Sequence, residues 1–315
     1  MVGTTAARWT PTAVVPAALV GVLIARLIAG SASNPTGGVD VAVRASADLA
    51  GAIVLGCGLL LTLAAGSRHV DGDSVWRVVA VAAGSWSVCE AALLVLGAVR
   101  SSSVAVRNIS LQTFTEYVQN IEAGRVGTAV LVVAVAATVL ATVVIREGHD
   151  LSGVLLGVPA AIALAARPVT GHMSQQTGGA PLLALHVVAA AIWLGLLFAM
   201  AVTLRSRTAW AEFLPRYSRI ALWCVVVVAL TGLIDAGVRV GSIASLTDTG
   251  YGRLVITKTV LVLALVAGGW WHRRRWVRDI GAHRTDPTVS ITRAATETAV
   301  MAVAFGVAAA LSTTA

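Results

Sequence analysis

The chain has 315 residues, of which 57% are hydrophobic and 12% charged, and its formal net charge is +8. Soluble domains carry roughly 25% charged residues, so this composition excludes an ordinary soluble domain and predicts an integral membrane protein. The positive charges fall between apolar runs, where they set membrane topology, and we expect no binding to nucleic acid. The three cysteines lie in separate apolar runs and predict neither a disulfide framework nor a CxxC metal site.

Nine apolar runs approach the ~20 residues needed to cross a bilayer. Long runs of Ala, Val, Leu and Gly without alternation are helical, because backbone groups in lipid must be hydrogen-bonded within the segment. We therefore predict an all-α polytopic bundle of about nine transmembrane helices, divided into residues 1–150 and 151–315. The predicted spans are 11–30, 46–65, 78–98, 125–145, 151–167, 181–203, 219–239, 253–271 and 294–313.

The first run allows two interpretations. Arg8 before an apolar core, followed by small residues at 29–33, resembles a cleavable signal peptide. Arg26 within that core favours a retained helix, because its long side chain lies near one end and can reach the interface. Predicted loops on the N-terminal side carry about twice as many arginines as those on the other side. We therefore predict a multi-pass protein of the plasma (inner) membrane with a cytoplasmic N-terminus.

Two outer segments separate the first helices. Residues 31–45 are rich in turn formers and predict a connector that ends with Asp48 at the mouth of the second helix. A segment near 104–122 has apolar residues at three- and four-residue spacings, the pattern of an amphipathic surface helix. This helix is either an interfacial anchor, which we favour, or a lid over the bundle.

Glu90 lies in the middle of the third apolar run. A charge at that depth costs ~2.5 kcal/mol or more, so one interpretation makes Glu90 part of a cation or proton pathway. The other is a protonated carboxyl group bonded to a neighbouring Ser or Thr. Both interpretations are kept as predictions.

The sixth run contains His186, the only histidine well inside an apolar run, and follows a polar loop with His172 and Met173. His186, Trp193 and Met200 are seven residues apart and share one helix face. Imidazole and thioether ligands suit Cu(I), so His172, Met173 and His186 predict a metal-capture site. Met200 would be a later stop on the same pathway and Trp193 part of its wall. The alternatives are a loop histidine, a packed histidine bonded to another helix, and core packing.

Several polar residues of the last three runs have structural interpretations. Asp235 and Lys258 lie near the outer ends of adjacent predicted helices and predict an ion pair. Cys224 is interpreted as a packing residue. Glu297 is interpreted as the partner of Arg293, one turn away.

Residues 171–275 combine several short motifs. Arg216-Tyr217-Ser218 opens a helix that contains Thr231-Gly232, an outward turn carries Tyr251-Gly252-Arg253, and Lys258 lies one turn into the next helix. Upstream, His186 is followed by Trp193 and Gly195. Together these motifs resemble the signature of the copper resistance protein D (CopD) family of inner-membrane copper proteins. One departure is Met173, where the family commonly has a small residue after the outer Gly-His.

The resemblance implies a protein that moves copper ions across the plasma membrane, in the uptake direction, or supplies copper for cytochrome oxidase assembly. Copper is thus the expected ion, whereas the ligand types alone would also admit zinc or manganese. The layout is similar to the CopD half of actinobacterial fusions with a CtaG-type cytochrome c oxidase assembly domain. The resemblance thus implies that this chain is a separated or truncated half of such a fusion. The expected partners are a CtaG-type domain, an extracytoplasmic (periplasmic) copper carrier and the lipid bilayer.

Other function classes have weaker support. The sequence contains no P-loop, GxGxxG or CPC-type ATPase motif, and we expect no enzymatic activity. A non-transporting scaffold or assembly subunit is the main alternative. A haem-bearing redox protein would normally need two intramembrane histidines as axial ligands, and only His186 qualifies.

Overall fold

A computed structural model describes residues 14–29, 35–102, 106–149, 151–169, 179–239, 252–253, 256–257, 259–267 and 287–314. Regular structure in these ranges is entirely helical, which confirms the all-α prediction. The helices are α1 (Val14–Ala29), α2 (Pro35–Leu63), α3 (Gly72–Ser102), α4 (Leu111–Asn120), α5 (Glu122–Glu147), α6 (Val154–Val169), α7 (Gly179–Thr203), α8 (Arg207–Arg239) and α11 (Pro287–Thr314), with a short 3-10 turn η2 at Val106–Asn108.

Five of these helices are long and apolar enough to cross a membrane. They cover Val39–Leu63, Gly72–Ser102, Glu122–Glu147, Gly179–Thr203 and Arg207–Asp235. Shorter apolar helices cover Pro16–Ala25, Val154–Arg167 and Ala294–Ala308. The predicted eighth span is described only in part, with residues 259–267 helical. The count of nine, the cytoplasmic N-terminus and the division at residue 150 stay predictions.

Two predicted boundaries are wrong. The connector at 31–45 is largely helical, since α2 begins at Pro35, and Asp48 lies well inside that helix. Proline is favoured in the first helical turn, where its missing N–H costs nothing, so Pro35 starts the helix despite its turn-rich neighbourhood. Helix α8 begins at Arg207, not at 219, and continues through Pro215. Hydropathy marks only the apolar part of a helix, and the polar residues ahead of it are also good helix formers.

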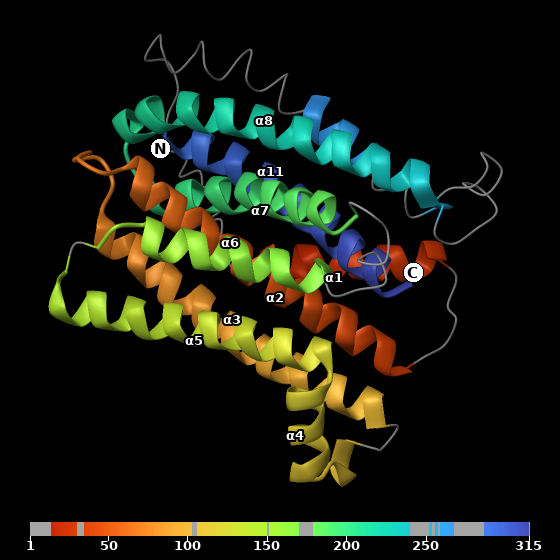
Figure 1. Ribbon diagram of the computed structural model, residues 1–315. Coiled ribbons are helices and arrows are strands. Elements are labelled where there is room, and N and C mark those ends of the chain that lie inside the picture. Colours follow the sequence, from red (N-terminus) through yellow and green to blue (C-terminus); the bar gives the residue numbers. More distant parts are fainter. Residues whose placement is uncertain are drawn as a thin grey trace, which may run out of the picture.

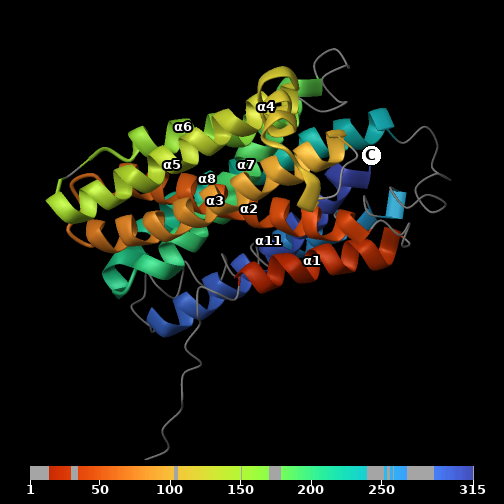
Figure 2. The same cartoon turned by 90° about the horizontal axis from the view of Figure 1, so that it is seen from below.

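Helix α2 lies at the centre of the bundle. It packs against α1, α3, α6, α7 and α11, while α8 packs on α7 and α5 packs on α3. Figures 1 and 2 show the long helices lying side by side, with α8 and α5 toward opposite edges in Figure 1. Helix α7 is therefore held between the central helix and α8, and the residues on its two sides face different neighbours.

Small residues allow a close helix crossing between α2 and α7. A Cβ atom on Gly195 would lie only 1.8 Å from the carbonyl oxygen of Ala52, and one on Gly56 would lie 1.9 Å from the carbonyl carbon of Gly195. Two helix backbones approach this closely only where side chains are absent. The backbone that approaches Gly195 of α7 is therefore that of helix α2.

The predicted amphipathic segment near 104–122 is helical at Leu111–Asn120, and it packs across α3 and α5 at one end of the bundle (Figure 1). The Ser110 side chain caps α4 by accepting a hydrogen bond from the Thr113 N–H. Tyr117 is buried against Gly97 of α3 and Gly124 of α5. Burial raises the pKa of the Tyr117 phenol, so it stays protonated at neutral pH. Leu111 at the start of the same helix is exposed, as an apolar residue of an interfacial anchor would be.

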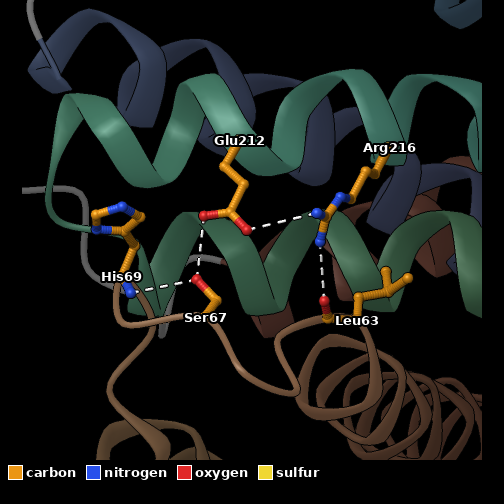
Figure 3. Close-up of polar contacts among 5 residues, drawn as sticks. All are labelled: Leu63, Ser67, His69, Glu212 and Arg216. Carbon is orange, nitrogen blue, oxygen red and sulfur yellow. Dashed lines mark hydrogen bonds and ion pairs between the residues drawn. The ribbon is translucent and has the colours of Figure 1, made fainter.

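At the other end of the bundle, a polar clasp joins the turn after α2 to the start of α8 (Figure 3). The Arg216 guanidinium donates a hydrogen bond to the Leu63 carbonyl oxygen at 3.0 Å, and the Ser67 hydroxyl donates one to Glu212 at 3.0 Å. Glu212 and Arg216 also form an ion pair, with 3.5 Å between the Glu212 Oε1 and Arg216 Nη2 atoms. The arginine of the Arg216-Tyr217-Ser218 motif thus donates to a carbonyl oxygen at the end of α2, which would otherwise lack a helical donor.

Candidate functional site

His186 lies on the side of α7 that faces α8. Its Nδ1 atom is 2.7 Å from the Thr231 hydroxyl oxygen. That hydroxyl also donates to the Val227 carbonyl oxygen, one turn earlier in α8, at 2.6 Å. A hydroxyl group has a single hydrogen, so Thr231 accepts its hydrogen bond from His186, and Nδ1 carries the proton.

This arrangement selects one tautomer of the neutral imidazole. With the proton on Nδ1, the lone pair lies on Nε2, the nitrogen turned away from Thr231. Metal-binding histidines commonly have this form, with one ring nitrogen held by an outer partner while the other binds the metal. Thr231 is therefore suited to orient His186 as a ligand.

The neighbour of Thr231 is Gly232, and a Cβ atom there would lie 3.6 Å from His186 Cε1. That distance is ordinary van der Waals contact, so the imidazole lies directly against the Gly232 backbone. A large side chain at this position would occupy the space beside the ring. Thr231 and Gly232 together define the α8 side of the His186 site.

The seven-residue spacing of α7 is matched on α8, which runs antiparallel to it after a short connection (Figure 1). From the His186–Thr231 contact, a step of seven residues along each helix pairs Trp193 with Cys224. A second step pairs Met200 with Tyr217. Each step covers roughly 10 Å. The side chains in these two pairs are all buried, namely Trp193, Cys224, Met200 and Tyr217.

The other two residues of the predicted capture site, His172 and Met173, lie outside the described residues, and so does Lys258. Asp235 is described, near the end of α8. The capture site of His172, Met173 and His186, and the Asp235–Lys258 ion pair, therefore stay predictions. Among the residues that the structure covers, no three His, Cys, Asp or Glu side chains gather as a metal site.

Glu90 has two partners inside the bundle. One carboxylate oxygen forms an ion pair with Arg167 of α6, and the other accepts a hydrogen bond from the Trp86 indole at 3.1 Å. The Glu90 side chain is only 2% exposed and that of Arg167 13%. The predicted alternative of a Ser or Thr partner is not what the structure shows, because an arginine from another helix occupies that place. The pathway role of Glu90 stays a prediction.

More charges surround this pair. Arg167 also interacts electrostatically with Asp48, Asp40 and Arg44 of α2. Asp40 forms an ion pair with Arg100 of α3. The three acidic residues and three arginines of this N-terminal charge network join α2, α3 and α6. Charges of both signs are thus balanced around the buried Glu90 and Asp40, as buried ions require, while the Arg100 side chain is 54% exposed.

Sequence reasoning did not find two of these features. Arg167 is the last residue of the predicted span 151–167, and nothing in the sequence pattern indicates its pairing with Glu90. Cys224 and Tyr217 were not connected with His186, although the repeated spacing of seven on both helices is visible in the sequence.

Comparison with protein families gives two matches. Residues 35–182 match the family model described as copper resistance protein D-like, N-terminal domain. Residues 211–311 match the model described as copper resistance protein D. Neither the curated proteins nor the solved structures contain a match. The two family matches cover the N-terminal charge network and most of α8 and α11, including Thr231.

Proposed function

The chain belongs to the copper resistance protein D family, and we propose that it carries copper ions across the plasma membrane. The ions would move along the contact between α7 and α8, which we call the α7–α8 seam and which His186 and Thr231 mark. His186 is the first ligand that the ion meets within the helices. The ion moves without bond-breaking chemistry, so the protein is a carrier and not an enzyme. Uptake is the direction favoured by the resemblance.

The observation that supports this proposal most is the contact between His186 and Thr231. A histidine inside an apolar helix is costly unless it is bonded or functional, and this one is held in the tautomer that suits a metal ligand. An imidazole nitrogen binds copper well, and so do thioether and thiol sulfurs. Supply of copper for cytochrome oxidase assembly, a CtaG-type partner and an extracytoplasmic carrier stay predictions.

Copper flux in reconstituted vesicles tests the proposal. We expect His186→Ala to reduce copper uptake by at least about tenfold, since loss of even an outer-shell partner costs that much in metal affinity. The matched control is His149→Ala, because the His149 side chain is exposed and pairs with Glu147 two residues away. Normal flux in His186→Ala, with equal amounts of folded protein, would show that the seam is not the route.

Thr231 gives a second, finer prediction. Thr231→Val keeps the shape of the side chain but cannot accept the hydrogen bond from His186, so the imidazole loses its orientation. We expect the affinity for Cu(I) to fall by about 10–100-fold, measured by competition with a coloured Cu(I) chelator. Thr231→Ser keeps the hydroxyl and should bind within about twofold of the unmodified protein. Equal affinities of the Val and Ser variants would contradict this role of Thr231.

A further inference from the structure

Helix α8 contains a proline, Pro215, between the two charged residues of the polar clasp, Glu212 and Arg216. A proline has no N–H, so the helical hydrogen bond to the Ala211 carbonyl oxygen cannot form, and the ring crowds that carbonyl. Helices bend most readily at such positions. The proline therefore divides α8 into a short arm, residues 207–214, and the longer body of the helix.

The polar clasp holds both sides of this proline to the same turn. On the arm, Glu212 accepts a hydrogen bond from the Ser67 hydroxyl at 3.0 Å. The Ser67 hydroxyl oxygen accepts one in turn from the His69 N–H at 3.2 Å. On the body, Arg216 donates to the Leu63 carbonyl oxygen at 3.0 Å. Figure 3 shows both charged side chains reaching from α8 to this turn, which thus bridges the point where α8 bends most readily.

The clasp is built from interactions that can break and re-form. The side chains of Glu212 and Arg216 are 27% and 42% exposed, so water competes for their charges and the ion pair adds little stability. The arm itself is better secured, because the Ser206 hydroxyl caps its first turn by accepting a hydrogen bond from the Ala209 N–H at 3.1 Å. The arm can therefore keep its helical structure when the clasp opens.

The arm closes the end of the α7–α8 seam that lies opposite His186. Trp210 and Phe213 of the arm are fully buried and belong to the same apolar cluster as Met200 of α7. The Trp210 indole also donates a hydrogen bond at 3.3 Å to the carbonyl oxygen of Leu204, in the connection between α7 and α8. His186, by contrast, is only half-buried. The seam is thus sealed at the arm and more open at His186.

We propose that the polar clasp and Pro215 form a gate at the arm end of the α7–α8 seam. When the clasp breaks, the arm turns about Pro215 and water reaches Met200; when the clasp re-forms, this end is sealed again. Transport by alternating access requires the two ends of a pathway to open in turn. The predicted topology places this end at the cytoplasm, where an ion taken up would leave. This inference rests on the proposed copper transport.

The reactivity of a thiol at position 200 measures the gate without copper. The full chain in detergent micelles carries Met200→Cys as its sole cysteine, with Cys57, Cys89 and Cys224 replaced by alanine. The probe is a water-soluble maleimide, and the measured quantity is the labelling rate. Because Met200 is buried in the closed arrangement, labelling requires the arm to move.

Two changes should shift this rate in opposite directions. Arg216→Gln weakens the clasp, so we expect labelling to become faster by about tenfold or more, since local opening follows the stability of the contacts that oppose it. Pro215→Ala restores the missing helical hydrogen bond, stiffens α8 and should make labelling slower. The matched control is Arg146→Gln, because Arg146 is an exposed arginine in the last turn of α5.

A second reporter separates gate opening from general loosening. With Cys57, which is fully buried in α2, as the sole cysteine, Arg216→Gln should leave labelling slow. Equally accelerated labelling of Cys57 would mean that the variant unfolds, and the gate would be wrong.

The remaining outcomes separate the gate from the proposed function. Equal labelling rates at position 200 in Arg216→Gln and Arg146→Gln would overturn the gate, while loss of flux in His186→Ala would leave copper transport standing. If the labelling rates change as expected but the unmodified protein moves no copper, the opening at Pro215 stands and the proposed function fails.

Discussion

Glu90→Gln is expected to destabilise the bundle strongly. The amide keeps an oxygen for the Trp86 indole but removes the negative charge opposite Arg167, whose guanidinium remains charged at neutral pH. Leaving one partner of a buried ion pair uncompensated costs about 3–5 kcal/mol, and we expect a loss toward the lower end of that range because Asp48 and Asp40 also oppose the charge of Arg167. The free energy of unfolding in mixed micelles, followed by tryptophan fluorescence, measures this loss.

The reverse change should cost less. In Arg167→Met the remaining carboxyl group of Glu90 can bind a proton and become neutral, whereas an arginine cannot lose its charge. The double variant Glu90→Gln/Arg167→Met removes both charges, so we expect it to be more stable than Glu90→Gln alone. That coupling is the signature of a direct interaction. Glu116→Gln is the control, because Glu116 is exposed on α4 and its loss should change stability by well under about 1 kcal/mol.

The same variants decide between structure and pathway for Glu90. A purely structural pair predicts that copper flux per folded molecule stays normal in the double variant. A pathway carboxylate predicts loss of flux in that variant even where folding has recovered. Stability of Glu90→Gln equal to that of Glu116→Gln would mean that the pair does not hold α3 to α6.

The sequence predicts the helices well and their beginnings less well. Hydropathy locates the apolar centre of each helix, as for α5, predicted at 125–145 and found at Glu122–Glu147. It fails where a helix extends into polar sequence, as α2 does from Pro35 and α8 from Arg207. The backbone hydrogen bonds of a helix continue past the apolar part, so composition alone gives no signal for its polar end.

For the site, the sequence predicts residue types but not partners. His186 was singled out because an imidazole in an apolar run is rare, and this needs no knowledge of the fold. That Thr231 is its hydrogen-bond partner, and that Arg167 pairs with Glu90, depends on which helices are neighbours. A periodic pattern along one helix fixes a face, whereas it does not say which helix that face meets. Matching the seven-residue spacings of α7 and α8 would have indicated that His186 faces Thr231.

Gly195→Ala is expected to disturb the packing of several helices at once. The added methyl carbon would lie 1.8 Å from the Ala52 carbonyl oxygen, so the α2 and α7 backbones must move apart. Overpacking a tight core costs about 1–3 kcal/mol and sometimes more, and here the clash is with backbone that cannot change rotamer. Because α2 also contacts α1, α3, α6 and α11, we expect a large loss of folded protein from the membrane fraction.

Two glycine variants show whether the helix crossing is the cause. In Gly84→Ala the new methyl would meet only Thr138, at 4.0 Å, and in Gly232→Ala only the His186 ring, at 3.6 Å. Both should fold normally, because the intrinsic preference for helix improves by up to about 1 kcal/mol when alanine replaces glycine. Gly56→Ala, from the other side of the crossing, should reproduce the defect of Gly195→Ala. If Gly195→Ala and Gly84→Ala yield equal amounts of folded protein, α7 is not held by this contact, and the position of His186 against α8 must be fixed by α8 alone.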